Sequence, residues 1–543
     1  MRKNDIISLE ISGMTSEGSG VGRHEGMAVF VAGTAIGEAI RCRIIKVSKK
    51  YAIGRIEEII TPSPHRIKPD CPVFKSCGGC VFRHISYDEE LKIKRQRVVD
   101  AVERIGGFDG ELVEEIIGAK SPDGYRNKAQ LPVGLDRNGN YITGFYAYRS
   151  HRIIDCGGCK LQPEIFTRVV EIFKSWCEIY KPEPYNEESH RGLIRHLYLR
   201  YGQSSGELMV TLVLNGSRVN GELELAQLLK DKIEGFKSLI INENREKTNV
   251  ILGRKCRTVW GKDYITDTLC GLKFNISPLS FFQVNHDQAE RLYSLAAEYA
   301  GLSGDEILLD LYCGTGTIGL TMANKAKRLI GVEVIPQAVE NAEENARLNN
   351  IDNAEFICAD ASKAAEKLNA DGVNPDVVVV DPPRKGLNPE LIKTIAQLNP
   401  DRVVYVSCDC ATMARDLKLF GEDNYTLKKL TPVDMFPRTG HVETVCLLSK
   451  LHSDQHIEVE VKMDELDLTA AESKATYEEI KEYVLEKYGL KVSSLYISQV
   501  KRKCGLEVGQ NYNLSKKEDA KVPQCPSEKE AAIMEALKHF QMI

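Results

Sequence analysis

Between residues 290 and 450 the sequence alternates short apolar runs with segments of helical periodicity. The apolar runs span residues 306–312, 329–334, 354–359, 377–380 and 402–407. Strands that alternate with helices form a parallel sheet, because each helix returns the chain to the edge where the next strand begins. Open sheets of this kind bind ligands beyond the carboxyl ends of their strands. We therefore expect an α/β domain whose reactive side chains directly follow these runs.

A glycine-rich segment follows the first run. Residues 314–319 read Gly-Thr-Gly-Thr-Ile-Gly and open a helix, so the backbone can pass close to a ligand at the helix N-terminus. The next run carries Glu333, 23 residues after Asp310. A carboxylate at that place can accept hydrogen bonds from both ribose hydroxyls. This pattern fits a nicotinamide dinucleotide as well as S-adenosylmethionine.

The later strand ends favour S-adenosylmethionine. The third run ends at Asp360, where a carboxylate can meet an adenine amino group. The fourth run ends in Asp381-Pro382-Pro383. An acidic residue before two prolines at this strand resembles a motif of methyltransferases that act on nitrogens or carbons of nucleic-acid bases. A nicotinamide enzyme has no need of that motif.

A thiol and a second carboxylate complete the set. Cys408 ends the fifth run, and Glu443 opens a further apolar run. Carbon 5 of uracil is a poor nucleophile until a thiolate adds at carbon 6, and a base must later remove the carbon 5 proton. We predict Cys408 as the nucleophile and Glu443 as the base. A buried structural cysteine is the usual alternative, but the polar neighbours Ser407 and Asp409 favour the catalytic role.

Together these motifs resemble the RNA uracil-C5 methyltransferase family over about residues 1–450. The segments that carry the resemblance are residues 280–285, 310–319, 381–386, 406–408 and 441–444. The resemblance implies a Rossmann-like catalytic domain with Cys408 as nucleophile and Glu443 as base. The residues that it places in contact with S-adenosylmethionine are Gln283, Tyr312, Glu333 and Asp381.

One position departs from the family pattern. The family usually has a proline two residues after the nucleophile, whereas this chain has Cys410. Two thiols therefore compete for the catalytic role. We favour Cys408, because it directly follows Val406-Ser407 as the family cysteine does, and we expect Cys410 to pack locally.

A second group of cysteines lies further forward. Cys71, Cys77 and Cys80 are close in sequence, and a fourth ligand is available from Cys156 or Cys159. Such thiolates bind zinc or an iron–sulfur cluster, and spacing alone does not separate the two. Cluster-bearing family members show this pattern, which implies a [4Fe–4S] cluster on Cys71, Cys77, Cys80 and Cys159. Zinc, or a separate half-site at Cys156 and Cys159, is the alternative.

At 543 residues the chain is too long for one core. Residues 1–62 alternate β-rich runs with glycine turns and resemble a TRAM domain, an OB-like β-barrel that binds RNA. Lys46, Lys49, Lys50 and Tyr51 give it a basic strip with an aromatic ring for phosphates and a base. We assign residues 63–285 to a central α+β iron–sulfur domain and residues 286–450 to the methyltransferase domain.

Residues 451–543 are charged and helix-periodic, so we expect a small helix-rich extension. Helices are predicted over 477–490 and 528–540, with a capping box at Thr469 and Glu472 and a basic spot at 500–503. An RNA-binding module and a stabilising appendage remain alternative roles for this part.

The resemblance implies S-adenosylmethionine-dependent methylation of carbon 5 of a uridine in 23S ribosomal RNA, because tRNA-specific relatives commonly lack the barrel and the cluster. The alternatives are a tRNA uracil-C5 methyltransferase and a non-catalytic, redox-responsive RNA-binding iron–sulfur protein. The target base should be flipped out of its stack. We find no signal peptide and no apolar run that could span a bilayer, so we expect a cytoplasmic monomer without an obligate protein partner.

Overall fold

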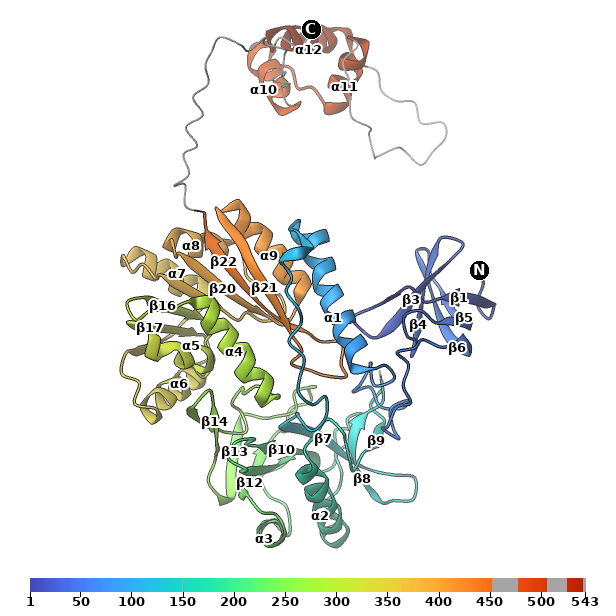
Figure 1. Cartoon of the computed structure of the whole chain (residues 1–543), viewed down its shortest axis with the longest axis vertical. Coiled ribbons are helices and arrows are strands. Elements are labelled where there is room, and N and C mark those ends of the chain that lie inside the picture. Colours follow the sequence, from blue (N-terminus) through green and yellow to red (C-terminus); the bar gives the residue numbers. More distant parts are fainter. Residues whose placement is uncertain (149, 452–476, 505–524, 541–543) are drawn as a thin grey trace. The chain divides into compact units, whose positions relative to one another are not determined.

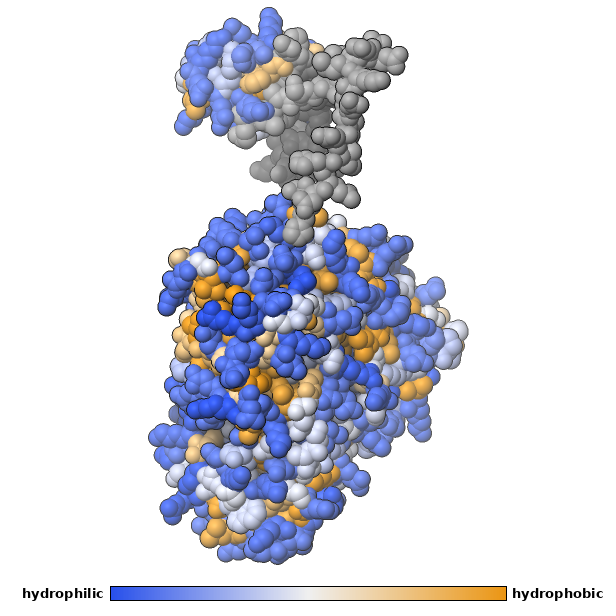
Figure 2. Space-filling view, turned by 60° about the vertical axis from the view of Figure 1, so that its left-hand side comes forward, coloured by the Kyte–Doolittle hydropathy of each residue, from blue (hydrophilic) through white to orange (hydrophobic). Residues whose placement is uncertain are grey.

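A computed structural model describes residues 1–148, 150–451, 477–504 and 525–540. The chain forms two compact units, Met1–His452 and Ser453–Ile543, which are described separately (Figure 1). Among the described residues, no helix is both long enough and apolar enough to cross a membrane. The surface in Figure 2 is mostly hydrophilic, with scattered hydrophobic patches.

The N-terminal sheet has six strands in the order β1-β5-β6-β4-β3-β2. They are β1 (Ile6–Glu10), β2 (Gly13–Met14), β3 (Ser19–His24), β4 (Met27–Ala32), β5 (Ala39–Val47) and β6 (Tyr51–Thr61). The sequence predicts β-rich runs at 6–11, 27–31, 39–47 and 52–60, and these correspond to β1, β4, β5 and β6, whose alternate side chains share one small core. The hydrogen-bonded order ends at β1 on one side and β2 on the other, so the sheet does not close into the full barrel that the sequence predicts. Ser12 N, between β1 and β2, donates to Val21 O of β3 at 2.9 Å.

A seven-stranded central sheet follows, in the order β13-β12-β11-β10-β7-β8-β9. Its strands are β7 (Lys128–Leu135), β8 (Tyr141–Tyr146), β9 (Ile153–Asp155), β10 (Ile194–Tyr201), β11 (Leu208–Leu214), β12 (Phe236–Glu243) and β13 (Lys255–Gly261). Helices α2 (Glu164–Tyr180) and α3 (Glu222–Lys232) cover it and share its hydrophobic core. The hairpin of β14 (Ile265–Leu269) and β15 (Leu272–Ile276) leads to the last sheet.

The third sheet has the order β18-β17-β16-β19-β20-β22-β21. Its strands are β16 (Ile307–Leu311), β17 (Arg328–Glu333), β18 (Ala354–Cys358), β19 (Val377–Val380), β20 (Arg402–Ser407), β21 (Tyr425–Val433) and β22 (Glu443–Lys450). Strands β16 to β20 are parallel, and β22 lies antiparallel between β20 and β21. The strand order reverses between β16 and β19, and such a switch point opens a crevice for a ligand.

Helices cover both faces of this sheet (Figure 1). The helices α4 (His286–Ala300), α5 (Thr317–Met322) and α6 (Pro336–Leu348) share one core. On the other face lie α7 (Ala361–Ala370), α8 (Pro389–Leu398) and α9 (Cys410–Glu422). Helix α1 (Tyr87–Ala101), which precedes the central sheet in the chain, joins this second core beside α9.

The described part of the second unit contains three helices: α10 (Tyr477–Tyr488), α11 (Ser494–Lys503) and α12 (Ser527–His539). Ile480, Val484, Ile497, Ile533 and Leu537 are fully buried between them, so this unit has a small core of its own. The predicted helices at 477–490 and 528–540 correspond to α10 and α12, and the basic spot lies at the end of α11. The capping box at Thr469 and Glu472 falls outside the described residues.

Candidate active site

The turn after β16 is shaped by two carboxylates. Asp310 Oδ2 accepts a hydrogen bond from Gly319 N at 2.9 Å, and Glu333 Oε2 accepts one from Gly314 N at 3.1 Å. Tyr312 has φ 67°, a left-handed conformation that is costly for a residue with a side chain. The strand end and the glycine turn are therefore held in one conformation, with the N-terminus of α5 open to a ligand.

A cavity of about 1480 Å³ lies at the switch point of the sheet. Six of the seven predicted cofactor and catalytic residues line it: Gln283, Tyr312, Glu333, Asp381, Cys408 and Glu443. Pockets for one small ligand usually measure about 300–1,000 Å³. This cavity is larger, so it has room for a nucleoside cofactor and a nucleobase together.

Asp360 is the predicted residue that does not line this cavity. It is the N-cap of α7, and its Oδ1 accepts hydrogen bonds from Ser362 N at 3.1 Å and Lys363 N at 3.4 Å. Capping a helix N-terminus satisfies amides that lack an intrahelical partner. The carboxylate thus has a structural use here, and its contact with adenine stays a prediction.

The junction of β20 and α9 places the two competing thiols differently. Cys408 lies between Ser407, the last residue of β20, and Asp409, whose carboxylate caps α9 by accepting from Ala411 N and Thr412 N, each at 3.0 Å. Cys408 faces the cavity. Cys410 is 3% exposed, packs in the core beside α1, and is not among the cavity residues. The geometry therefore favours Cys408 over Cys410 as the thiol available to a substrate.

Burial and like charges set the protonation of the site. Burial, then the negative charges of Glu443 and Asp381, raise the pKa of Cys408 to about 11. Burial and Asp381 likewise raise the pKa of Glu443 to about 8, and burial raises that of Asp381 to about 7. Arg384 acts in the opposite direction on Cys408 and Glu443. A positively charged ligand in this cavity would be stabilised by both carboxylates.

These pKa values predict different pH profiles for kcat and kcat/KM. We expect kcat, which includes proton removal after methyl transfer, to rise up to about pH 8 as Glu443 ionises. We expect kcat/KM, which ends at methyl transfer, to rise over the whole range, because Cys408 keeps its proton to about pH 11. The pH profile is measured as initial rates of methylation in a series of buffers between about pH 6 and about pH 9.5. A flat profile would contradict it. Since a bound sulfonium favours anions, the kcat profile should lie at lower pH.

Arg384 and His441 line the cavity and received no role from the sequence, although both stand in segments that carry the family resemblance. Arg384 directly follows Asp381-Pro382-Pro383, and His441 stands two residues before Glu443. Val442 between them is 2% exposed and packs in the core. Alternation along an extended chain therefore turns His441 and Glu443 to the same side. The spacing of two residues between His441 and Glu443 could therefore have predicted that His441 also faces the cavity.

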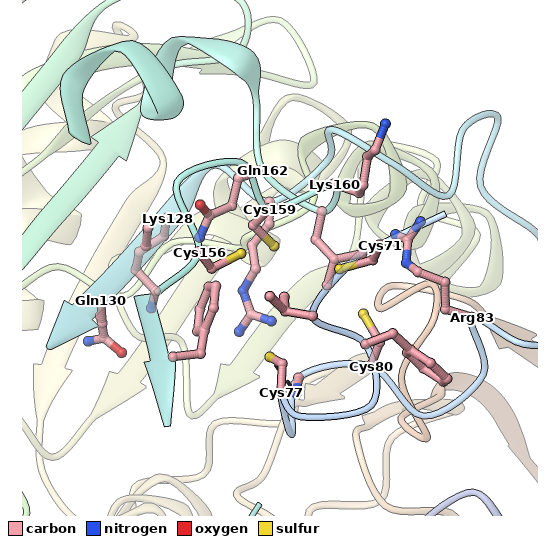
Figure 3. A pocket seen from close by; sticks show the side chains of 17 residues that line it. Cys71, Cys77, Cys80, Arg83, Lys128, Gln130, Cys156, Cys159, Lys160 and Gln162 are labelled. Carbon is pink, nitrogen blue, oxygen red and sulfur yellow. Dashed lines mark hydrogen bonds between the residues drawn. The ribbon is translucent and has the colours of Figure 1, made fainter. Parts of the chain in front are cut away.

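A second, smaller cavity of about 250 Å³ is lined by thiols. Its cysteines are Cys71, Cys77, Cys80, Cys156 and Cys159. Figure 3 shows that the sulfur atoms approach the same space from two segments, one before α1 and one between β9 and α2. All four predicted cluster ligands are thus brought together, and Cys156 joins them.

Cations surround these thiols. Arg83, Arg126, Lys128 and Lys160 line the same cavity, and Arg83 hydrogen-bonds Cys80. Arg83 Nη1 donates to Asp70 Oδ1 at 2.8 Å, so its guanidinium is held in place. A hydrogen bond from Cys159 lowers the pKa of Cys156. Among the residues that the structure describes, no three His, Cys, Asp or Glu side chains are close enough to hold a single metal ion.

Comparison with known proteins places this arrangement in a family. The family model described as tRNA (uracil-5-)-methyltransferase matches residues 87–451, and the TRAM domain model matches residues 3–56. An uncharacterized RNA methyltransferase of Clostridium tetani is 46% identical over 449 residues, which cover 83% of this chain and 97% of that protein. One of Halalkalibacterium halodurans is 44% identical over 448 residues, 82% of this chain and 98% of that protein.

A solved structure agrees with this match. The crystal structure of Pyrococcus abyssi tRNA (uracil-54, C5)-methyltransferase in complex with S-adenosyl-L-homocysteine superposes with a TM-score of 0.66 and 29% identity. The alignment covers 81% of this chain and 100% of that one. The family model ends at residue 451, before the second unit.

Proposed function

The chain belongs to the tRNA (uracil-5-)-methyltransferase family. We propose that the base it methylates at carbon 5 is a uridine of 23S ribosomal RNA. The protein is an S-adenosylmethionine-dependent RNA uracil-5-methyltransferase with an N-terminal TRAM domain. The observation that carries the catalytic proposal is the single cavity shared by Cys408, Glu443 and the cofactor-facing strand ends. The thiol-lined cavity supports the ribosomal substrate, since the cluster is commonly absent from tRNA-specific members.

Transfer RNA is the second candidate substrate. The Pyrococcus abyssi enzyme, named for uracil 54 of tRNA, aligns over its whole length with this chain. Overall architecture therefore does not separate the two RNA classes. The RNA itself has to be tested.

The site residues support a covalent mechanism. S-adenosylmethionine supplies a methyl group activated by its positive sulfonium. Cys408 loses its proton and its sulfur adds to carbon 6 of a flipped-out uracil, which places electron density on carbon 5. After carbon 5 has taken the methyl group, Glu443 accepts the proton from carbon 5, the carbon 6–sulfur bond breaks, and the thiolate leaves. The positive charge of Arg384 favours the thiolate of Cys408 and the carboxylate of Glu443, the two anions that these steps require.

The cofactor assignments are part of the same proposal. Glu333 would accept hydrogen bonds from the ribose hydroxyls, next to the glycine turn that its Oε2 already holds. Gln283, Tyr312 and Asp381 line the cavity beside it. The negative charge of Asp381 would lie near the sulfonium, where it favours binding.

Tritium release distinguishes the substrates. Protein purified anaerobically is incubated with S-adenosylmethionine and carbon-5-tritiated ribosomal RNA or transfer RNA. We expect release from 23S ribosomal RNA and none from transfer RNA, because the proton leaves carbon 5 in each turnover. Release from transfer RNA alone would keep the reaction and overturn the ribosomal assignment.

We propose further that Cys71, Cys77, Cys80 and Cys159 hold a [4Fe–4S] cluster. Four thiolates around an iron–sulfur cube carry net negative charge, and the cations around this cavity fit that charge. A cube is larger than one ion and holds its thiolates further apart, which agrees with a cavity between the two cysteine segments. The cluster would hold these segments together.

Loss of one ligand should remove the cluster. We expect Cys159→Ser to lose the iron, acid-labile sulfide and visible absorbance that the anaerobically purified wild type should show at about four iron atoms per chain. Cys156→Ser is the matched control in the same cavity and should keep them. Iron loss in Cys156→Ser with retention in Cys159→Ser would exchange their roles. Equal retention in both would contradict the proposed ligand set.

A further inference from the structure

Helix α1 carries a polar stripe on the face that it turns toward the protein. Tyr87, Glu90, Lys94 and Arg97 are spaced by three or four residues, so they share one face. The side chains of Glu90 and Lys94 are 0% and 2% exposed. Charged groups are seldom buried to this extent unless they are paired, because they lose their hydration.

Lys94 has one partner on its own helix and two on the loop between β21 and β22. Its Nζ donates to Glu90 Oε1 at 2.7 Å, to Asp434 Oδ1 at 2.7 Å and to Phe436 O at 3.1 Å. Asp434 Oδ2 accepts from Tyr87 OH at 2.7 Å. All three donors of the ammonium group are used, two of them on residues about 340 positions away in sequence.

The same helix holds the middle of the loop through Arg438. The backbone N of Arg438 donates to Glu90 Oε1 at 2.6 Å. The Nη1 of Arg438 donates at 3.1 Å to Ile85 O, just before the helix begins. Arg438 has φ 68°, a left-handed conformation that a residue with a side chain adopts at a cost. The network thus maintains a bend that the loop would not favour alone.

The end of the loop is fixed next to the candidate base. Gly440 O accepts from Arg97 Nη1 at 2.6 Å, and Tyr125 OH donates to Pro437 O at 3.0 Å. Three residues further on, Glu443 begins β22. Phe436, Thr439, Gly440, His441 and Glu443 all line the large cavity. The path of this loop therefore decides how the carboxylate of Glu443 enters the cavity.

Two other segments meet the loop at the same place. Val81 N and Phe82 N donate to Arg438 O at 2.8 Å and 3.2 Å, directly after Cys80. A side chain on Gly440 would collide with Ser16 O, in the connection between β2 and β3, which would lie 1.7 Å from an ideal Cβ. Close packing on three sides leaves the loop little freedom, and the ion pairs of Lys94 with Glu90 and Asp434, which anchor the loop to α1, are almost completely buried.

We propose that the buried network of Glu90, Lys94, Asp434 and Arg438 consists of positioning residues that aim Glu443 at the carbon 5 proton. The inference rests on the proposed function. Cys408 lies between β20 and α9, which Asp409 caps, and the hydrogen bonds given above for the network reach neither of these elements. Disturbing the network should therefore slow proton removal more than addition of the thiol.

The test compares two products of the same folded enzyme. Lys94→Met removes the ammonium group, and the double variant with Asp434→Asn also removes the carboxylate left without its partner. Labelled RNA is incubated with S-adenosylmethionine, and covalent adduct and released methylated RNA are separated under denaturing conditions. We expect the ratio of adduct to product to rise about 10- to 100-fold in both variants, the scale of a misplaced catalytic group. Partial unfolding lowers both products and leaves the ratio unchanged.

Glu38→Gln provides the matched control, because Glu38, just before β5 and far from α1 in sequence, is fully buried and paired with Arg66. It should lose stability and keep the wild-type ratio. A wild-type ratio in both network variants would overturn the positioning role, whatever their stability. If the wild type released no tritium from any RNA, the proposed function itself would fail, which is a separate result.

Discussion

Replacing Cys408 with alanine is expected to abolish methylation while RNA binding is retained. Without the thiolate, nothing adds to carbon 6, and carbon 5 stays too weak a nucleophile to take the methyl group. We expect the rate to fall at least about 10⁴-fold, the scale on which loss of a covalent nucleophile acts. Tritium release measures the rate, and filter binding of the same RNA measures affinity. Because Cys408 is partly exposed in the cavity, the smaller side chain should disturb the fold little.

Cys410→Ala is the matched control two residues away. Cys410 is buried against α1, so its loss costs some packing energy, about 1 kcal/mol for a small buried side chain. Methylation should persist in the folded protein. Retained methylation in Cys408→Ala together with loss in Cys410→Ala would move the nucleophile to Cys410. Retained RNA binding without methylation in Cys408→Ala would exclude a protein that only binds RNA.

Much of the catalytic sheet could be predicted, because its strands are buried on both faces and therefore appear as unbroken apolar runs. The predicted runs at 377–380 and 402–407 match β19 and β20 in both bounds. Their carboxyl ends meet at one edge of the sheet, so the convergence of Asp381 and Cys408 on one cavity followed from topology.

The polar stripe of α1 could not be predicted. Glu90 and Lys94 are spaced four apart, and on sequence alone that pattern indicates a solvated helix face with an ion pair. Their burial depends on Asp434, which lies 340 residues after Lys94 in the chain. Local periodicity carries no information about a partner at that distance. The role of Asp360 was equally hard to predict, because an aspartate at the end of a strand and an aspartate that caps the next helix have the same sequence pattern.

The thiol-lined cavity could be predicted from the sequence in part only. The close spacing of Cys77 and Cys80 predicted that they share a site, and they do share a cavity. The choice between Cys156 and Cys159 depended on resemblance, and both thiols reach the same cavity. Only two residues separate Cys156 from Cys159, so position in sequence does not rank the two thiols as ligands.

Replacing Glu443 with glutamine is expected to trap the enzyme on its RNA. Addition of Cys408 and transfer of the methyl group precede proton removal, so both can still occur, whereas an amide cannot accept the carbon 5 proton. The carbon 6–sulfur bond then cannot break. Denaturing electrophoresis of labelled RNA should show a covalent RNA–protein species, and tritium release should fall about 10²- to 10⁴-fold, the range of general-base contributions.

The fold should tolerate this change. Burial already raises the pKa of Glu443 to about 8, so the folded protein favours the neutral carboxyl at neutral pH, and a neutral amide of the same shape replaces it. Asp267→Asn is a suitable control, because Asp267 is a fully buried carboxylate that accepts hydrogen bonds from the amides of Gln203 and Ser204 and does not line the cavity. It should lose stability without forming an adduct. If Glu443→Gln released tritium at the wild-type rate, another group would have to be the base. If it formed no adduct and no product, Glu443 would act before proton removal, in the activation of Cys408.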